Sequence, residues 1–344
     1  MQKTVEDAFK VFDELDDKDE AWNVYPYMLK LGSQAVGKLV LGMDFGHFEA
    51  VDAPLHAMVM RIAQSLELNK KITSMGSWYA SMPFGAPAQL KAARTHIEAM
   101  INQSIEDASK GVEDLELQEA AVKAENMVDY VLRATDSKGN KLPIEKIREP
   151  LVVATGAGFT TTSSLLSWLM YGLVAYPGMQ ERLLQELIDN DVDENTAITP
   201  ELTQKLTFLD AYIKETQRKH NPSYQPARTS KDSIVIPAIH HIHNNPAIWD
   251  NPAQFNPDRW STEAVKNRPT ASYVPFATGP RMCIGFNFAL QEVKVFLPKL
   301  VYRYAFTKAG DHTVDYDPMF QLIRPTNLYV RGEKRVKWPP KSNA

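Results

Sequence analysis

The spacing of apolar residues predicts helices over most of the first two thirds of the chain. Apolar positions recur three and four residues apart over 21–43, 54–68 and 87–109. In the last of these segments one stripe is formed by Leu90, Ala93, Ile97, Ile101 and Ile105. A helix with such a stripe buries it against a neighbouring element, so these segments predict a helical core.

Five further helices are expected from the same spacing together with breakers and caps. They cover residues 1–15, 117–133, 144–175, 177–190 and 283–304. A sixth begins near Thr207, which resembles a capping box with Asp210 three residues on, and it is stopped by Pro222.

The pattern changes after Pro222. SIVIP and NLYVR are short β-branched or apolar runs typical of strands, proline becomes frequent, and loops dominate until Ile284. The chain has no internal repeat, low-complexity tract or evident linker. It is therefore expected to form a single domain, 1–344, that is mainly α with a minor β component.

One segment, 150–180, has no charged residue and is long enough to cross a bilayer. Its middle holds Gly156, Gly158 and several hydroxyl residues, which favours a helix buried in protein and leaves a membrane helix as the alternative. The N-terminus is charged throughout, so it predicts neither a signal peptide nor an anchor. The net charge of -4 does not favour a nucleic-acid partner.

The chain has one cysteine, Cys283, which excludes an intramolecular disulfide and any zinc site built from several thiolates. It lies in the sequence FATGPRMCIG, where Gly279 permits a tight turn and Gly285 a close approach of chain and cofactor. The helix expected directly afterwards turns its positive end toward the sulfur and favours a thiolate. Phe276 can shield that sulfur from water, and Arg281 can reach an acidic group on a cofactor edge.

The alternative for this segment is a buried cysteine in a glycine-containing loop. Five fixed positions at average residue frequencies would coincide in about one chain in ten thousand, which favours a functional loop. Three histidines, His240, His241 and His243, invite a metal interpretation, because a strand would place the last two on one face. No carboxylate adjoins them, so a zinc site is disfavoured.

FATGPRMCIG resembles the cysteine-ligand loop of the cytochrome P450 family, and three further segments resemble motifs in the family's order. ETQR at 215–218 resembles its E-x-x-R helix, and FNPDRW at 255–260 its P-x-R-F segment, with Trp in the last place. AGFTTTS at 157–163 resembles the oxygen-binding bend of its long central helix. The chain is thus identified as an N-terminally shortened member of the eukaryotic microsomal, fungal-like type, which implies a cytochrome P450-like fold lacking its N-terminal part.

The resemblance implies that haem b, iron protoporphyrin IX, binds with the Cys283 thiolate as its metal ligand. The cofactor-binding residues that it implies are Phe276, Gly279, Arg281, Cys283, Gly285, Arg228 and His243. Arg228 matches a second arginine for a haem propionate, and His243 opens the segment HNNP at the family's H-R-D-P position, with a packing and cofactor-edge role.

Glu215 and Arg218, three residues apart on one helix, on their own predict a surface ion pair that contributes little. The resemblance implies a buried trio in which Arg218 and Arg259 both grip Glu215. Its role is to lock the cysteine loop, and breaking it would cost roughly 3–5 kcal/mol.

Gly158 and the threonine run weaken regular helical hydrogen bonding, because hydroxyls bond back to carbonyls, and they predict a local bulge. The resemblance implies a catalytic group of Ala157, Gly158, Thr160 and Thr161, in which Thr161 helps deliver protons to oxygen. The family usually has an acid where this chain has Thr160, and Thr160→Asp is therefore expected to restore a proton donor. A packing face of small residues is the alternative.

The resemblance implies a haem-thiolate monooxygenase that inserts one oxygen atom from O2 into a hydrophobic organic substrate. Its electron donor is expected to be an NADPH-dependent cytochrome P450 reductase or a similar protein, attracted by Arg281, Lys294 and Lys299. Complete members of this type usually lie on the endoplasmic reticulum membrane, but this chain shows no anchor. The alternative is a non-catalytic remnant that acts as a structural or interaction protein.

Overall fold

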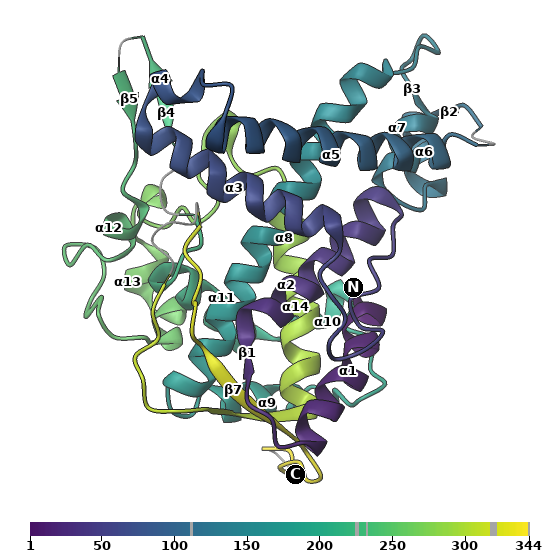
Figure 1. The fold of residues 1–344 in the computed structure, drawn as a ribbon. Helices are drawn as coiled ribbons and strands as arrows, with labels where there is room; N and C mark the ends of the chain where they lie inside the picture. The colour runs from purple at the N-terminus through teal and green to yellow at the C-terminus, as the bar shows by residue number, and fades with distance from the viewer. Residues whose placement is uncertain (111–112, 224–226, 232, 317–321, 343–344) are drawn as a thin grey trace. The chain divides into compact units, whose positions relative to one another are not determined.

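The structure, a computed structural model, describes the chain except residues 111–112, 224–226, 232, 317–321 and 343–344. The described part is mainly helical with a few short strands, which confirms the fold class predicted from the sequence (Figure 1). Contacts divide the chain into two compact units. The first holds the described parts of 1–28, 161–316 and 322–342, and the second holds those of 29–160.

The second unit is built on two long helices that pack against each other, α3 (Ala57–Met75) and α5 (Gly85–Ala108) (Figure 1). All five members of the predicted stripe on α5 are buried. The unit also contains most of α2 (Val24–Val36), η1 (Gly37–Leu41), α4 (Ser77–Ala80), β2 (Leu115–Glu116), β3 (Ala134–Thr135) and the first half of α8 (Ile144–Ala175).

Two helices, α6 (Leu117–Lys123) and α7 (Met127–Arg133), form where the sequence indicates one over 117–133. The break is made by Asn126, whose side chain accepts the backbone N–H of Asp129 at 2.9 Å. An asparagine in this role begins a new helix and so ends the preceding one. The single-helix prediction is therefore wrong at 124–126.

In the first unit, α14 (Phe286–Arg303) packs against α1 (Gln2–Asp17) and α9 (Met179–Asp189). The apolar face expected on α1 is buried. A three-stranded antiparallel sheet in the order β1 (Trp22–Asn23), β7 (Tyr329–Lys334) and β6 (Tyr304–Lys308) completes this core. The runs SIVIP and NLYVR both contribute strands, the first of them β5 (Ser233–Val235).

The rest of the first unit carries the segments with the sequence motifs. It consists of the second half of α8, α10 (Pro200–Lys205), α11 (Thr207–Lys219), the hairpin of β4 (Arg228–Ser230) and β5, α12 (Ile239–His243), η2 (Pro257–Ser261), α13 (Glu263–Lys266), η3 (Thr270–Ser272) and η4 (Gly279–Arg281). The short helix η2 packs against α11.

Helix α11 begins at Thr207, but the capping box expected there does not form. Glu186 of α9 instead accepts the backbone N–H of Phe208 at 2.5 Å. Asp210 is engaged by Lys294 at 2.9 Å and does not reach back to the helix start. A carboxylate from another helix thus satisfies the free donors of the first turn, and no local sequence pattern announces it.

Helix α8 has the bounds that the sequence predicts. Within the described residues, no helix combines the length and the apolar character needed to cross a membrane.

Candidate functional site

Cys283 closes a tight loop just before α14. Its backbone N–H donates to the Phe276 carbonyl at 2.9 Å, and Ala277 and Gly279 turn the chain with φ values of 60° and 75°. The thiol is exposed, and Gly285 caps the N-terminus of α14 two residues later. The sulfur therefore lies beside the positive end of a helix dipole, which favours negative charge.

The two residues that flank Cys283 are apolar and exposed. Ile284 is fully exposed, and 42% of Met282 is exposed. A methyl group added at Gly279 or at Gly285 would meet no atom within 4 Å. Apolar side chains held open beside a thiol are stabilised when an apolar group covers them, so this loop fits a flat apolar cofactor bound through sulfur.

The segment before this loop, 273–276, is anchored to α11 and α12. The Tyr273 hydroxyl donates to Gln217 Oε1 at 3.0 Å, and the Val274 N–H donates to His243 Nε2 at 3.0 Å. These bonds fix the two residues that precede Pro275 and Phe276. The position of the cysteine loop is therefore set by helices distant in sequence.

Helix α11 also carries the fully buried Glu215. Its carboxylate accepts Arg218 Nε at 2.9 Å, Arg218 Nη2 at 2.8 Å and Arg259 Nε at 3.1 Å. The structure thus brings together the trio that the resemblance implies. Two guanidinium groups in good hydrogen-bonding geometry compensate the burial of the carboxylate.

Two further donors to Glu215 are not predicted from the sequence. The Asn256 N–H donates to Oε1 at 2.8 Å, and Trp260 Nε1 donates to Oε2 at 3.1 Å. The indole of Trp260 also packs edge-on against Tyr273, with ring centroids 4.6 Å apart. The signal was present, because a tryptophan in place of phenylalanine brings an N–H that a buried carboxylate can use.

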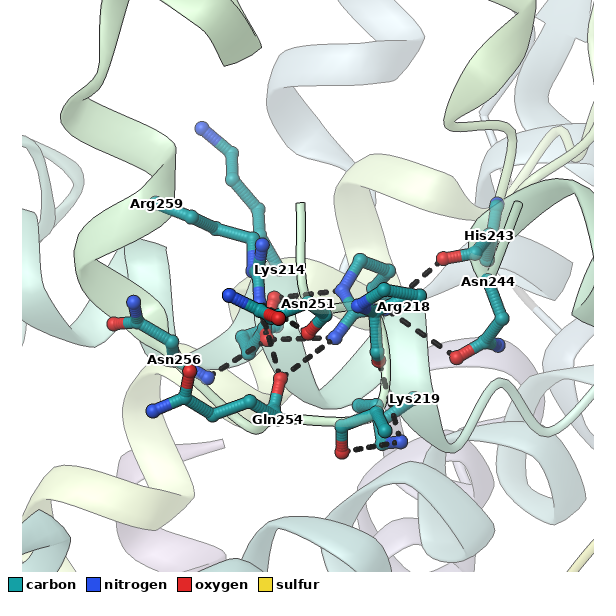
Figure 2. Close-up of polar contacts among 12 residues, drawn as sticks. Lys214, Arg218, Lys219, His243, Asn244, Asn251, Gln254, Asn256 and Arg259 are labelled. Atoms are coloured by element: carbon teal, nitrogen blue, oxygen red, sulfur yellow. Dashed lines mark hydrogen bonds and ion pairs between the residues drawn. The ribbon is translucent and has the colours of Figure 1, made fainter. Parts of the chain in front are cut away.

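The same arginines also bind backbone carbonyls (Figure 2). Arg218 donates from Nη1 to the His243 carbonyl at 3.0 Å and from Nη2 to that of Gln254 at 3.1 Å. Arg259 donates from Nη1 to the Asp250 carbonyl at 2.7 Å. We call Glu215, Arg218, Arg259, Asn256 and Trp260 the Glu215 cluster. It ties α11 to α12 and to the irregular chain between α12 and η2.

The bulge expected in α8 does not form, because the chain is α-helical from Ile144 to Ala175. Thr160 is 2% exposed, and its hydroxyl donates to the Gly156 carbonyl at 3.0 Å. A Cβ at Gly158 would lie 3.2 Å from a methyl group of Val36. Thr160 and Gly158 therefore have packing roles here, and the hydroxyl back-bond is accommodated within a regular helix.

The members of the group implied for α8 differ in exposure. Ala157 is exposed, Gly158 and Thr161 are half-buried, and Thr160 is buried. A spacing of four places Ala157 and Thr161 on one face of the helix, whereas Thr160 is rotated from Thr161 by about 100°. Of the four residues that the resemblance implies, Thr160 is the one withdrawn from the surface.

The three histidines lie on a helix, α12, and not on a strand that would place His241 and His243 on one face. His243 is completely buried, so its role is packing and hydrogen bonding and not contact at an open edge. Burial lowers its pKa to about 4. Among the residues that the structure describes, no three His, Cys, Asp or Glu side chains are grouped in a way that could hold a metal ion.

The basic residues assigned to the cofactor and to an electron donor lie in different environments. Arg228 donates from Nη2 to the Arg281 carbonyl at 3.1 Å, next to the exposed Arg281 side chain. Lys294 is paired with Asp210, and Lys299 is 2% exposed. Burial and pairing withdraw the two lysines from a docking surface, which corrects the expectation for them. Arg281 remains exposed.

Comparison with known proteins agrees with this geometry. The cytochrome P450 family profile matches residues 1–330. Cytochrome P450 monooxygenase alnD of Emericella nidulans is 46% identical over 99% of this chain and 65% of its own length. Cytochrome P450 4F3 of Homo sapiens is 34% identical over 65% of this chain and 46% of its own length.

Solved structures show the same fold. The haem domain of cytochrome P450DA superimposes with a TM-score of 0.83 over 97% of this chain and 72% of that one, at 21% identity. The chain spans slightly less than two thirds of the length of alnD and less than half of that of 4F3. The match of the family profile to residues 1–330, the cysteine loop and the cluster around Glu215 agree: the chain belongs to the cytochrome P450 family.

Proposed function

We propose that this chain forms the haem-binding part of a monooxygenase that inserts one oxygen atom from O2 into a hydrophobic organic substrate. The observation that supports it most strongly is the exposed Cys283 thiol, framed by open apolar side chains at the start of α14. The relative alnD is named a monooxygenase, which supports the same reaction class. When bound, haem b supplies the iron chemistry that activates O2.

The residues of the cysteine loop would hold the cofactor. Cys283 is the iron ligand, and the open space at Gly285 leaves room for the ring. Met282 and Ile284, both exposed, would offer apolar contact to the cofactor. Arg281, with its exposed guanidinium, can bind an acidic substituent of the ring.

Other residues of the chain set the charge and position of these groups. Cys283 lies two residues before Gly285, the N-cap of α14. The Glu215 cluster holds α11 and α12, to which the segment before the loop is anchored. On α8, Thr161 holds an exchangeable proton at Oγ1, and Ala157 offers a small apolar surface to a substrate.

The proposed electron donor is a reductase protein that docks near the cysteine loop. Arg281 is the exposed positive charge in that loop, and it can attract an acidic partner surface. Arg281→Glu is therefore expected to slow electron transfer, most strongly at low ionic strength where screening is weak.

The decisive test is the absorption spectrum of the haem-supplemented, reduced protein under carbon monoxide. Thiolate ligation gives a characteristic red-shifted Soret band, and Cys283→Ser is expected to abolish that band. Circular dichroism of both proteins controls for folding. If both proteins show the same spectrum, Cys283 does not bind iron and the proposed function is wrong.

A further inference from the structure

We propose that His243 positions the cysteine loop by accepting the backbone N–H of Val274 with a neutral imidazole ring. His243 is completely buried, and its Nε2 lies 3.0 Å from the Val274 nitrogen. The importance of this contact rests on the proposed function, because Cys283 needs a fixed position only if it binds the iron. The contact itself is a property of the protein chain and can be tested without haem.

His243 links the Glu215 cluster to the cysteine loop. Its carbonyl accepts Arg218 Nη1 at 3.0 Å, while its ring holds Val274 and packs 5.2 Å from the Tyr273 ring. Val274 lies two residues before Phe276, whose carbonyl accepts the N–H of Cys283. A displacement of Val274 would therefore also displace Phe276 and, through this hydrogen bond, Cys283.

The hydrogen bond requires one protonation state of the ring. Nε2 accepts only when the single proton is on Nδ1. Nδ1 is buried and has no hydrogen-bond partner among the residues that the structure describes, so the Val274 N–H is the contact that selects this tautomer. A second proton would turn Nε2 into a donor facing the N–H of Val274. The loop is therefore held by the neutral ring and released by the imidazolium.

The groups around His243 favour the neutral ring. Burial has the largest effect and lowers the pKa of His243. The backbone of Gln217 raises this pKa, whereas Arg218 on α11, His240 on α12 and Arg268 before η3 lower it further, and the net shift is downward. Tyr273 faces the ring from the next segment. Its pKa is raised by burial, so it is uncharged over the range in which His243 titrates.

Hydrogen exchange of the Val274 amide in the cofactor-free protein tests the proposal. His243→Leu keeps the apolar volume and removes the acceptor, whereas the side-chain carbonyl of His243→Gln can accept the same N–H and cannot gain a proton. We expect protection of Val274 and of Cys283 to fall roughly tenfold in the leucine variant and to be retained in the glutamine variant. His241→Leu, on the same helix, is the matched control and is expected to leave protection unchanged.

The pH dependence distinguishes positioning from packing. The folded pKa of His243 lies below that of an unfolded histidine, so the bond contributes fully above pH 6.5 and is lost as pH falls toward 4. Protection factors of Val274 are expected to fall over that window in the native sequence and to stay level in His243→Gln. This comparison holds even if the leucine variant does not fold.

Equal protection in native protein and His243→Leu would overturn the proposal, and so would a glutamine variant that exchanges as fast as the leucine one. These results are independent of the iron spectrum. Normal exchange with no thiolate band would refute the proposed function alone, and a thiolate band with unaltered exchange in His243→Leu would refute the positioning role alone.

Discussion

Arg259→Met tests how much the Glu215 cluster contributes to the fold. Methionine keeps much of the apolar stem and removes the charge that lies 3.1 Å from the fully buried Glu215. It also removes the donors that bind the Asp250 carbonyl at 2.7 Å and the Gln254 carbonyl at 3.0 Å, although the latter keeps its bond from Arg218. Breaking a buried pair from one side costs roughly 3–5 kcal/mol. Because Arg218 still binds Glu215, we expect a loss of about 3 kcal/mol.

A matched control lies on the same protein unit. Arg182 makes a similar two-pronged pair with Asp258, at 3.1 and 2.6 Å, but its side chain is 43% exposed and that of Asp258 is 61% exposed. Solvent screens such a pair, and the usual contribution is about 0–1 kcal/mol. Arg182→Met thus removes the same chemical group from a similar geometry without the burial.

Urea unfolding followed by tryptophan fluorescence measures both variants, and Trp249 and Trp260 report directly on the region of the cluster. With a slope of about 3 kcal/mol per molar urea, the midpoint of Arg259→Met should fall by about 1 M, and that of Arg182→Met by no more than a third of this. Two midpoints that agree within error would show that burial does not strengthen this ion pair, and the reasoning would fail.

Substitutions at three further positions test individual side chains. Trp260→Phe keeps an aromatic ring but removes one hydrogen bond to the Glu215 carboxylate, so unfolding in urea should show a loss of about 1.5–3 kcal/mol. Glu186→Ala removes the acceptor of two backbone N–H groups at the start of α11, and thermal unfolding should report a loss of about 1–2 kcal/mol. Thr160→Asp places a carboxylate in a site that is 2% exposed, so urea unfolding should show a loss of several kcal/mol in stability. The stability of Thr160→Val should stay within about 1 kcal/mol of that of the native sequence.

Periodicity predicted the helices well because each long helix buries one apolar stripe. The bounds of α8 and the buried face of α5 were both expected. Local patterns gave a wrong prediction where a polar side chain determines the start of a helix. Asn126 divides one expected helix into two, and Glu186 begins α11 in place of the capping box at Thr207. The second of these contacts joins residues far apart in the chain, and no local pattern encodes it.

The candidate site was predictable to the extent that its residues are neighbours in sequence. The turn at Gly279, the cysteine and the helix after it form one continuous motif. The exposure of each residue of α8 was not predictable, since it depends on which face the surrounding helices cover. The role of His243 was not predictable either, because the N–H that its ring accepts lies 31 residues later in the chain.

The two departures from the family motifs have different physical consequences. At 260, tryptophan donates an additional N–H to a buried carboxylate that already accepts from two arginines. The extra hydrogen bond helps to compensate the burial of this charge. At 160, threonine stands where an acid is usual, and it is buried with its hydroxyl bound to its own helix. An acid there would bring a charge into a buried site. A carboxylate is tolerated better on the face of α8 that carries the exposed Ala157 than at the buried position 160.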